Sequence, residues 1–191
     1  MANQDAPFGL KPISRTGSSY NGSINRYYIP ATDSTPMGVG DPVVSSVEGG
    51  DADGVATVTR AAAGDAIRGV VVGFDFLNRN QEDLPQYRPA SVECYAMVAD
   101  DPGMRVLVQE TASLNATKIG LNVDFVVTDA DSTTGRSQVM IDSSSPSTTN
   151  TLPLKILELY PTDDNVIGDN ANWICSLNTS ELKGDTGSTG I

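Results

Sequence analysis

Histidine is missing from this 191-residue sequence, and with it the most common general base and the most common metal ligand of proteins. A serine or cysteine nucleophile would have no imidazole to activate it. The cysteines Cys94 and Cys175 lie far apart in strand-like segments, and we interpret both as buried, reduced thiols. We therefore predict a protein that is not an enzyme and that uses neither a cofactor nor a metal.

Positive charge is also scarce, because 12 Lys and Arg side chains stand against 24 Asp and Glu side chains, for a formal net charge of -12. Binding to nucleic acid needs clustered Lys and Arg, so we predict that nucleic acid is not a partner. No stretch approaches the run of about 18 apolar residues that a membrane helix needs. The first residues show neither the basic nor the apolar segment of a signal peptide, so we also predict no membrane contact.

Two short motifs resemble known sites but lack the surroundings that those sites need. The run Asp185-Thr186-Gly187-Ser188 matches the signature of aspartic proteases, yet it stands in a Gly-rich tail with no strand before it to bury it. Asp51 and Asp53 begin like a calcium loop, but the later ligands of an EF-hand are missing. We interpret the first motif as a coincidence and the second as an Asp-rich turn.

The sequence does contain a succession of short segments that are rich in Val and Ile and are separated by Gly, Pro, Asn and Asp, a pattern typical of strands. The predicted strands are Arg26–Ile29, Pro42–Val47, Val55–Thr59, Ile67–Phe76, Ser91–Val98, Met104–Gln109, Val123–Thr128, Ser137–Ile141, Leu152–Leu159 and Asn172–Leu177. Only Leu107–Gly120 favours a helical turn or two. Many short strands without long helices indicate an all-β protein with a jelly-roll or barrel-like body.

The ends of the chain differ from this body in composition. Residues 1–25 are predicted to form an extended arm, because Pro7 and Pro12 oppose regular pairing and apolar residues are sparse. Residues 26–182 form the predicted β-rich body, and residues 183–191 form a predicted flexible tail without core material. The arm carries the side chains that we expect to enter a groove on another protein, namely Phe8, Leu10, Ile13 and Tyr20.

Several segments, in order along most of the chain, resemble a family of tailed-bacteriophage virion proteins, the capsid decoration (cement) proteins. The opening Met1–Pro12 and the Leu-Pro-Leu-Lys run at 152–155 are the more specific parts of this resemblance. Shorter pieces are Tyr20–Gly22, Asn25–Pro30, Val39–Val43, Gly69–Phe74 and Asp164–Gly168. The resemblance implies a protein on the outer surface of the virion that binds the major capsid protein and itself, as a homotrimer or, alternatively, a dimer. It carries no catalytic motif over to this chain.

Three hypotheses of function follow from these observations. The first is a cement protein, made in the bacterial host cytoplasm, that stabilises contacts between capsomers. The second is a virion surface recognition module, such as a head-fibre or carbohydrate-binding domain, although only 6% of the residues are aromatic. The third, ranked last, is a hydrolase that uses Glu93, Asp100, Asp101 and Glu110.

Overall fold

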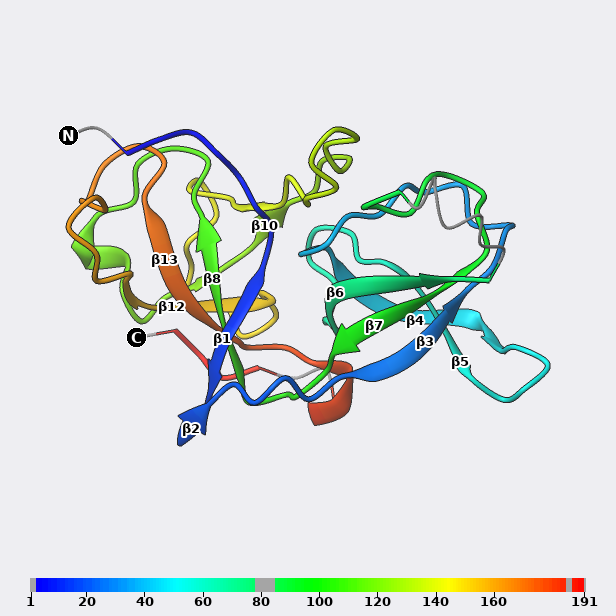
Figure 1. Ribbon diagram of the computed structural model, residues 1–191. Coiled ribbons are helices and arrows are strands. Elements are labelled where there is room, and N and C mark those ends of the chain that lie inside the picture. The colour runs from blue at the N-terminus through cyan, green and yellow to red at the C-terminus, as the bar shows by residue number, and fades with distance from the viewer. Residues whose placement is uncertain (1–2, 78–84, 185–186, 191) are drawn as a thin grey trace.

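Residues 25–99 close into a five-stranded barrel, which forms one of two lobes that lie side by side in the computed structural model (Figure 1). The structure describes residues 3–77, 85–184 and 187–190. The barrel strands follow the order β3-β5-β4-β6-β7, and β7 pairs with β3 to close the ring. Their bounds are β3 Asn25–Ile29, β4 Pro42–Gly50, β5 Ala56–Arg60, β6 Gly69–Phe76 and β7 Cys94–Ala99. All of these pairs are antiparallel except β3 with β5.

The second lobe is built on a six-stranded sheet with the order β2-β1-β8-β13-β12-β9. Its strands are β1 Lys11–Arg15, β2 Ser18–Ser19, β8 Met104–Gln109, β9 Asn122–Val123, β12 Leu154–Leu159 and β13 Asn172–Leu177. A separate two-stranded sheet pairs β10 Phe125–Val126 with β11 Met140–Ile141. This sheet lobe therefore combines the start of the chain with everything that follows the barrel.

The prediction of an all-β fold is confirmed, and each predicted strand segment overlaps an observed strand. The barrel-like body is present as the closed barrel of residues 25–99. Among the described residues, helical structure is limited to two single 3₁₀ turns, η1 Ala116–Lys118 and η2 Glu181–Lys183. The first of these lies inside the segment where a helical turn was predicted. No described helix is long and apolar enough to cross a membrane.

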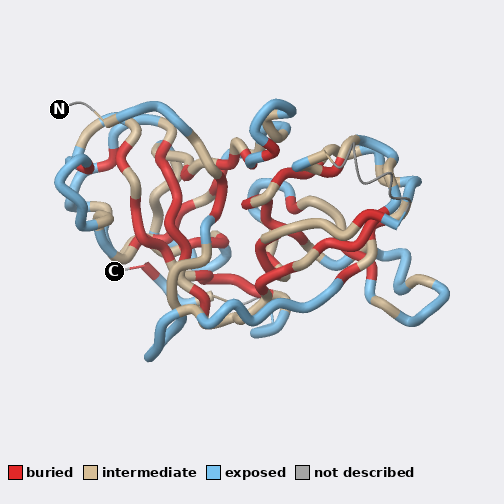
Figure 2. The backbone as a smooth tube through the Cα atoms, viewed as in Figure 1, coloured by how far each residue is buried: buried red, intermediate tan, exposed pale blue. Residues whose placement is uncertain are grey.

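Two clusters of buried apolar side chains stabilise the lobes. Figure 2 shows where the buried residues lie along the backbone. Successive residues of β6 face opposite sides, so Val71 packs inside the barrel while Val70 packs into the core of the sheet lobe. Ala61, Ile67 and Ala99 from the barrel half of the chain also belong to the core of the sheet lobe. The two lobes thus share one apolar core across their boundary, which the predicted single body did not distinguish.

The predicted extended arm is instead part of the sheet, because β1 pairs along β8 and extends the six-stranded sheet beside β2. The pairing register shifts between Pro12 and Ser14, which marks a bulge or irregularity. A bulge tolerates a proline, since the missing N–H is not needed there. Pro12 therefore does not exclude strand pairing, contrary to the prediction from the sequence.

The predicted flexible tail is also different, because the described residues 187–190 lie against the sheet lobe. Asn178 accepts a hydrogen bond from the backbone N–H of Ser188 at 2.9 Å, and Asn122 donates to the Ser188 carbonyl at 2.7 Å. The backbone N–H of Gly190 donates to the carbonyl of Thr148 at 3.1 Å. These contacts are polar and use backbone groups, so no apolar pattern in the sequence predicts them.

Candidate functional site: an apolar groove beside the N-terminal segment

The structure places the four predicted contact residues in three different environments. Leu10 is 1% exposed and packs in the core of the sheet lobe, so its side chain does not project as the predicted arm residue would, although it is one of the residues that line the groove described below. Its backbone N–H donates to the carbonyl of Gly40 at 2.9 Å, which ties the N-terminal segment to the barrel half. Phe8 and Tyr20 are half-buried, and Ile13 is half-buried on β1.

Phe8, Leu10 and Tyr20 come together at an open groove of about 450 Å³ between the N-terminal segment and the barrel. We call it the N-terminal groove; Ile13 does not line it. Its wall from the barrel half consists of Val39, Gly40, Val71 and Val72, and Leu107 of β8 completes the apolar surface. A volume of this size falls in the range of pockets that hold a small ligand or several side chains. The groove is therefore the candidate binding surface of the molecule.

Two glycines allow the N-terminal segment to lie this close to the barrel half. Gly9 adopts φ +74, and a Cβ there would lie 2.7 Å from the carbonyl oxygen of Gly40. Gly40 adopts φ +100, and a Cβ there would lie 2.6 Å from the carbonyl oxygen of Phe8. Positive φ costs other residues strain, and neither position has room for a side chain. Both positions are thus fixed by the geometry that forms the groove.

Two cationic side chains, Lys11 and Arg136, line the same groove and are exposed to solvent. Neither makes an ion pair among the described residues. This is notable in a chain with a formal net charge of -12, where cations are outnumbered two to one. The groove is therefore an apolar surface with positive charge at its side, in a molecule that is otherwise acidic.

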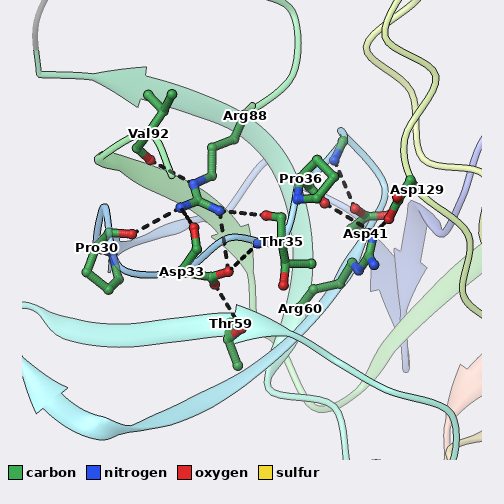
Figure 3. Close-up of polar contacts among 11 residues, drawn as sticks. Pro30, Asp33, Thr35, Pro36, Asp41, Thr59, Arg60, Arg88, Val92 and Asp129 are labelled. Carbon is green, nitrogen blue, oxygen red and sulfur yellow. Dashed lines mark hydrogen bonds and ion pairs between the residues drawn. The ribbon is translucent and has the colours of Figure 1, made fainter. Parts of the chain in front are cut away.

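The mouth of the barrel holds a fully buried cation, Arg88 (Figure 3). Its guanidinium donates to the carbonyls of Thr35 at 2.6 Å, Asp33 at 2.6 Å, Val92 at 2.8 Å and Pro30 at 3.0 Å. The carboxylate of Asp33 lies 3.6 Å from it and also accepts from the Thr59 hydroxyl at 2.9 Å. A guanidinium that is saturated by carbonyls in this way fixes loops and is not available to a ligand.

Asp41 is a buried acid next to this region, at the start of the barrel strand β4 (Figure 3). One of its oxygens accepts the backbone N–H of Gly38 at 2.9 Å, and the other has no hydrogen-bond partner. Burial raises the pKa of Asp41 above its ordinary value. The nearby Arg60 is paired with Asp129 at 2.9 Å, across the boundary between the lobes. Because Asp41 is closed off from solvent, a substrate has no access to it.

Glu110 is a second buried acid, at the end of β8 in the sheet lobe. It accepts the backbone N–H of Leu114 at 2.7 Å and of Ala171 at 3.2 Å. Burial raises the pKa of Glu110 to about 7, against the opposing effect of these donors. A shift of this size is common at catalytic acids, but the side chain is 0% exposed and so serves to hold two loops together.

The other carboxylates of the hydrolase hypothesis each have their own structural partners. Glu93 accepts from the hydroxyl of Tyr28, and Asp100 accepts from Tyr27 at 2.6 Å. Asp101 accepts the N–H of Gly103 at 2.7 Å and pairs with an arginine of β1. With Glu110 buried, these acids do not form a shared reaction centre.

The other candidate sites considered from the sequence stabilise the fold, as far as they lie within the described residues. Cys94 and Cys175 are both free and buried, as predicted, and burial raises the pKa of the Cys94 thiol to about 12. Asp51 accepts the backbone N–H groups of Asp53 and Val55, as an Asp-rich turn does. The described residues contain no group of three or more His, Cys, Asp or Glu side chains that could hold a metal. Residues 185–186 of the protease-like motif lie outside the described residues.

Comparison of the chain with protein-family models, with curated proteins and with solved structures finds no match.

Sequence reasoning located part of the groove and missed the rest. Phe8 and Tyr20 were recognised as apolar residues in a poorly apolar segment. Lys11 and Arg136 were missed, because they lie 125 positions apart and only the fold brings them to one surface. Glu110 was named only as a carboxylate of the hydrolase hypothesis and Arg88 was not named, since nothing in the local pattern distinguishes a buried charge from a solvated one.

Proposed function

We propose that this protein is a structural component of a tailed-bacteriophage head, a decoration or cement protein that binds the outside of the capsid shell. The observation that carries the proposal is the N-terminal groove, because it offers a partner protein an apolar surface and offers a substrate no reactive group. The assignment to a phage head rests on the resemblance of the segments quoted above. The partners are then the major capsid protein and further copies of this chain.

The charge of the molecule supports a place on the outer side of the shell. A surface with a formal net charge of -12 is repelled by packaged DNA, so the inner face of a head is unfavourable for it. On the outside, the same charge keeps the free protein soluble before it binds. An acidic decoration protein therefore fits the outer surface better than the inner one.

Avidity supplies the mechanism by which such a protein would stabilise a head. Each copy buries only a modest patch, but copies that touch neighbouring capsomers and each other act as one multivalent clamp. A clamp needs a rigid body, and here the two lobes share one apolar core. Ion pairs and hydrogen bonds also cross the boundary, among them the bond from Ser45 to Glu181 at 2.6 Å. We propose that this rigidity transmits load between capsomers.

The alternative, a surface recognition module for carbohydrate, receives less support. Sugars stack on exposed aromatic rings, and no aromatic side chain among the described residues is fully accessible on the surface. Tyr28, the nearest candidate, is half-buried and its hydroxyl is bonded to Glu93. Binding of purified protein to a glycan panel would favour this alternative.

The proposal is tested by adding purified protein to phage heads that lack it and sedimenting the mixture. We expect the protein to pellet with the heads and to saturate at a fixed number of copies per shell. Protein that remains in the supernatant at every concentration would show that the proposed function is wrong.

A further inference from the structure

Val47 is the most exposed large apolar residue among the described residues. Its exposed fraction is 104%, while the next largest value is 48%, at Ile167. It lies in the hairpin between β4 and β5, which projects from the barrel at the end of the molecule far from β1 (Figure 1). We call residues 46–54 the hairpin tip. A projecting valine with no cover within its own chain needs an explanation other than folding.

The hairpin tip is held in place. The carboxylate of Asp51 accepts the N–H of Asp53 at 2.9 Å, the N–H of Val55 at 2.8 Å and the hydroxyl of Tyr95 at 2.8 Å. The guanidinium of Arg26 lies 3.5 Å from the centre of the Tyr95 ring and supports it from the neighbouring strand. Residues 51–55 of the hairpin tip are therefore ordered, which reduces the conformational entropy that the tip loses when a partner covers it.

The hairpin tip and the N-terminal groove have complementary chemistry. The tip carries Val47 together with the acids Glu48, Asp51 and Asp53, and residues 42–59 contain no Lys or Arg. The groove is lined by apolar side chains and by Lys11 and Arg136. An apolar projection with negative charge matches an apolar recess with positive charge.

The two surfaces cannot meet within one copy. The groove reaches Gly40, just before β4 begins, whereas Val47 lies toward the other end of β4. Seven residues of extended strand separate the two positions by about 23 Å, at about 3.3 Å for each residue. The tip of one molecule can therefore enter only the groove of another.

From this complementarity we infer that copies of the protein associate head to tail, with the hairpin tip of one copy seated in the N-terminal groove of the next. The inference deepens the self-association included in the proposed function, and it rests on that function for its role on the head. A contact between two different surfaces closes into a ring when the rotation between copies allows it, as in a trimer. Phe8 and Tyr20 then contact a second copy of the protein. Of the four predicted contact residues, Ile13 is the one that could contact the capsid shell.

Two variants remove one side of the contact each, and neither touches the core. Val47→Asn removes the apolar side chain of the hairpin tip without changing its charge, and the double variant Lys11→Glu, Arg136→Glu reverses the charge of the groove. Sedimentation equilibrium of the purified full chain at low salt should show an oligomer for the wild type. Each variant should associate at least about tenfold more weakly, as expected for loss of a central contact. Ile167→Asn, at an exposed site outside the groove, is the matched control and should associate like the wild type.

Mixing the two variants gives the sharpest readout. The hairpin variant keeps an intact groove and the groove variant keeps an intact hairpin, so the mixture should form a one-to-one heterodimer and no larger species. Combining Glu48→Lys and Asp53→Lys with the groove reversal in one chain should restore the oligomer.

A monomeric wild type, an oligomer that survives both variants, or a mixture that stays monomeric would each overturn the inference. Equal urea midpoints for the variants and the wild type show that a loss of association is not a loss of folding. Sedimentation with heads separates the two proposals. A monomeric wild type that binds heads leaves the proposed function standing, whereas an oligomer that binds none removes it and leaves the head-to-tail contact.

Discussion

Arg88 shows how a single residue closes one end of the barrel. Its guanidinium donates to four backbone carbonyls from the loops 30–35 and 88–92. Burying a charge is costly unless it is paired and fully hydrogen-bonded, and here both conditions are met. The order of these loops therefore depends on one side chain.

We predict that Arg88→Met destabilises the fold by about 3 kcal/mol or more, because it leaves buried carbonyls and the Asp33 carboxylate without their donor. The measurement is the free energy of unfolding from urea titration. Arg15→Met is the matched control, since Arg15 pairs with Asp101 at 3.4 Å while its side chain is 48% exposed. That exposed pair should change stability by less than about 1 kcal/mol. Equal losses for the two variants would contradict the role assigned to Arg88.

Glu110 makes stability depend on pH near neutrality. The pKa of Glu110 in the folded protein is about 7, above its ordinary value of 4.5, so the folded state binds this proton more tightly than the unfolded chain. Its contribution is therefore complete below about pH 4.5 and is lost as pH rises through about 7, with an upper limit of about 3 kcal/mol. Asp169 faces the same carboxyl and raises its pKa further.

The variant Glu110→Gln should flatten this dependence, because an amide does not titrate. The measurement is the difference in unfolding free energy between wild type and variant at about pH 5 and about pH 8. We expect the wild type to lose more stability than the variant on going to the higher pH. Parallel pH profiles for the two proteins would show that Glu110 does not titrate in this range.

At the scale of the elements, two substitutions in and beside β1 distinguish a free N-terminal arm from a segment that is part of the sheet. Leu10→Ala should cost about 2–4 kcal/mol of unfolding free energy, because Leu10 is buried in the core of the sheet lobe. Ile13→Ala, at a half-buried position on β1 itself, should cost clearly less. A free arm would give no loss at either position, and urea titration of both variants distinguishes the two cases.

The sequence predicted those strands that are formed by runs of apolar residues, and it did not predict segments whose contacts are polar or that contain proline. Segments such as Met104–Gln109 and Asn172–Leu177 matched their strands, because runs of β-branched and apolar residues report burial directly. β1 was not predicted because Pro12 argued against a strand. The strand tolerates this proline because the pairing register with β8 shifts between Pro12 and Ser14. Residues 187–190 were missed because their contacts use backbone groups and Asn side chains.

The candidate site could be predicted only in part, for a similar reason. Apolar residues of the groove, such as Phe8 and Tyr20, stand out in a segment that is otherwise polar. The opposite wall, Val39 to Val72, reads as ordinary barrel sequence, and Arg136 belongs to a loop. A surface assembled from segments this far apart has no local pattern, so the fold had to be known.

At the scale of the whole molecule, the shared core should make the two lobes unfold together. Cys94 lies in the barrel core and Cys175 in the core of the sheet lobe, so each thiol reports on its own lobe. We predict that pulses of a thiol reagent label both cysteines with the same midpoint in urea, since Ala61, Ile67 and Val70 join the barrel to the other core. Labelling of one cysteine at a clearly lower urea concentration would show that the lobes are independent.

We propose that this rigid, acidic, all-β molecule strengthens a phage head from outside. The most direct measurement is the temperature at which heads release their DNA, recorded by calorimetry for heads that lack the protein, with and without the purified protein added. We predict that added protein raises the temperature of DNA release, and that this increase stops when binding to the heads is complete. Heads that bind the protein fully and still open at an unchanged temperature would contradict it.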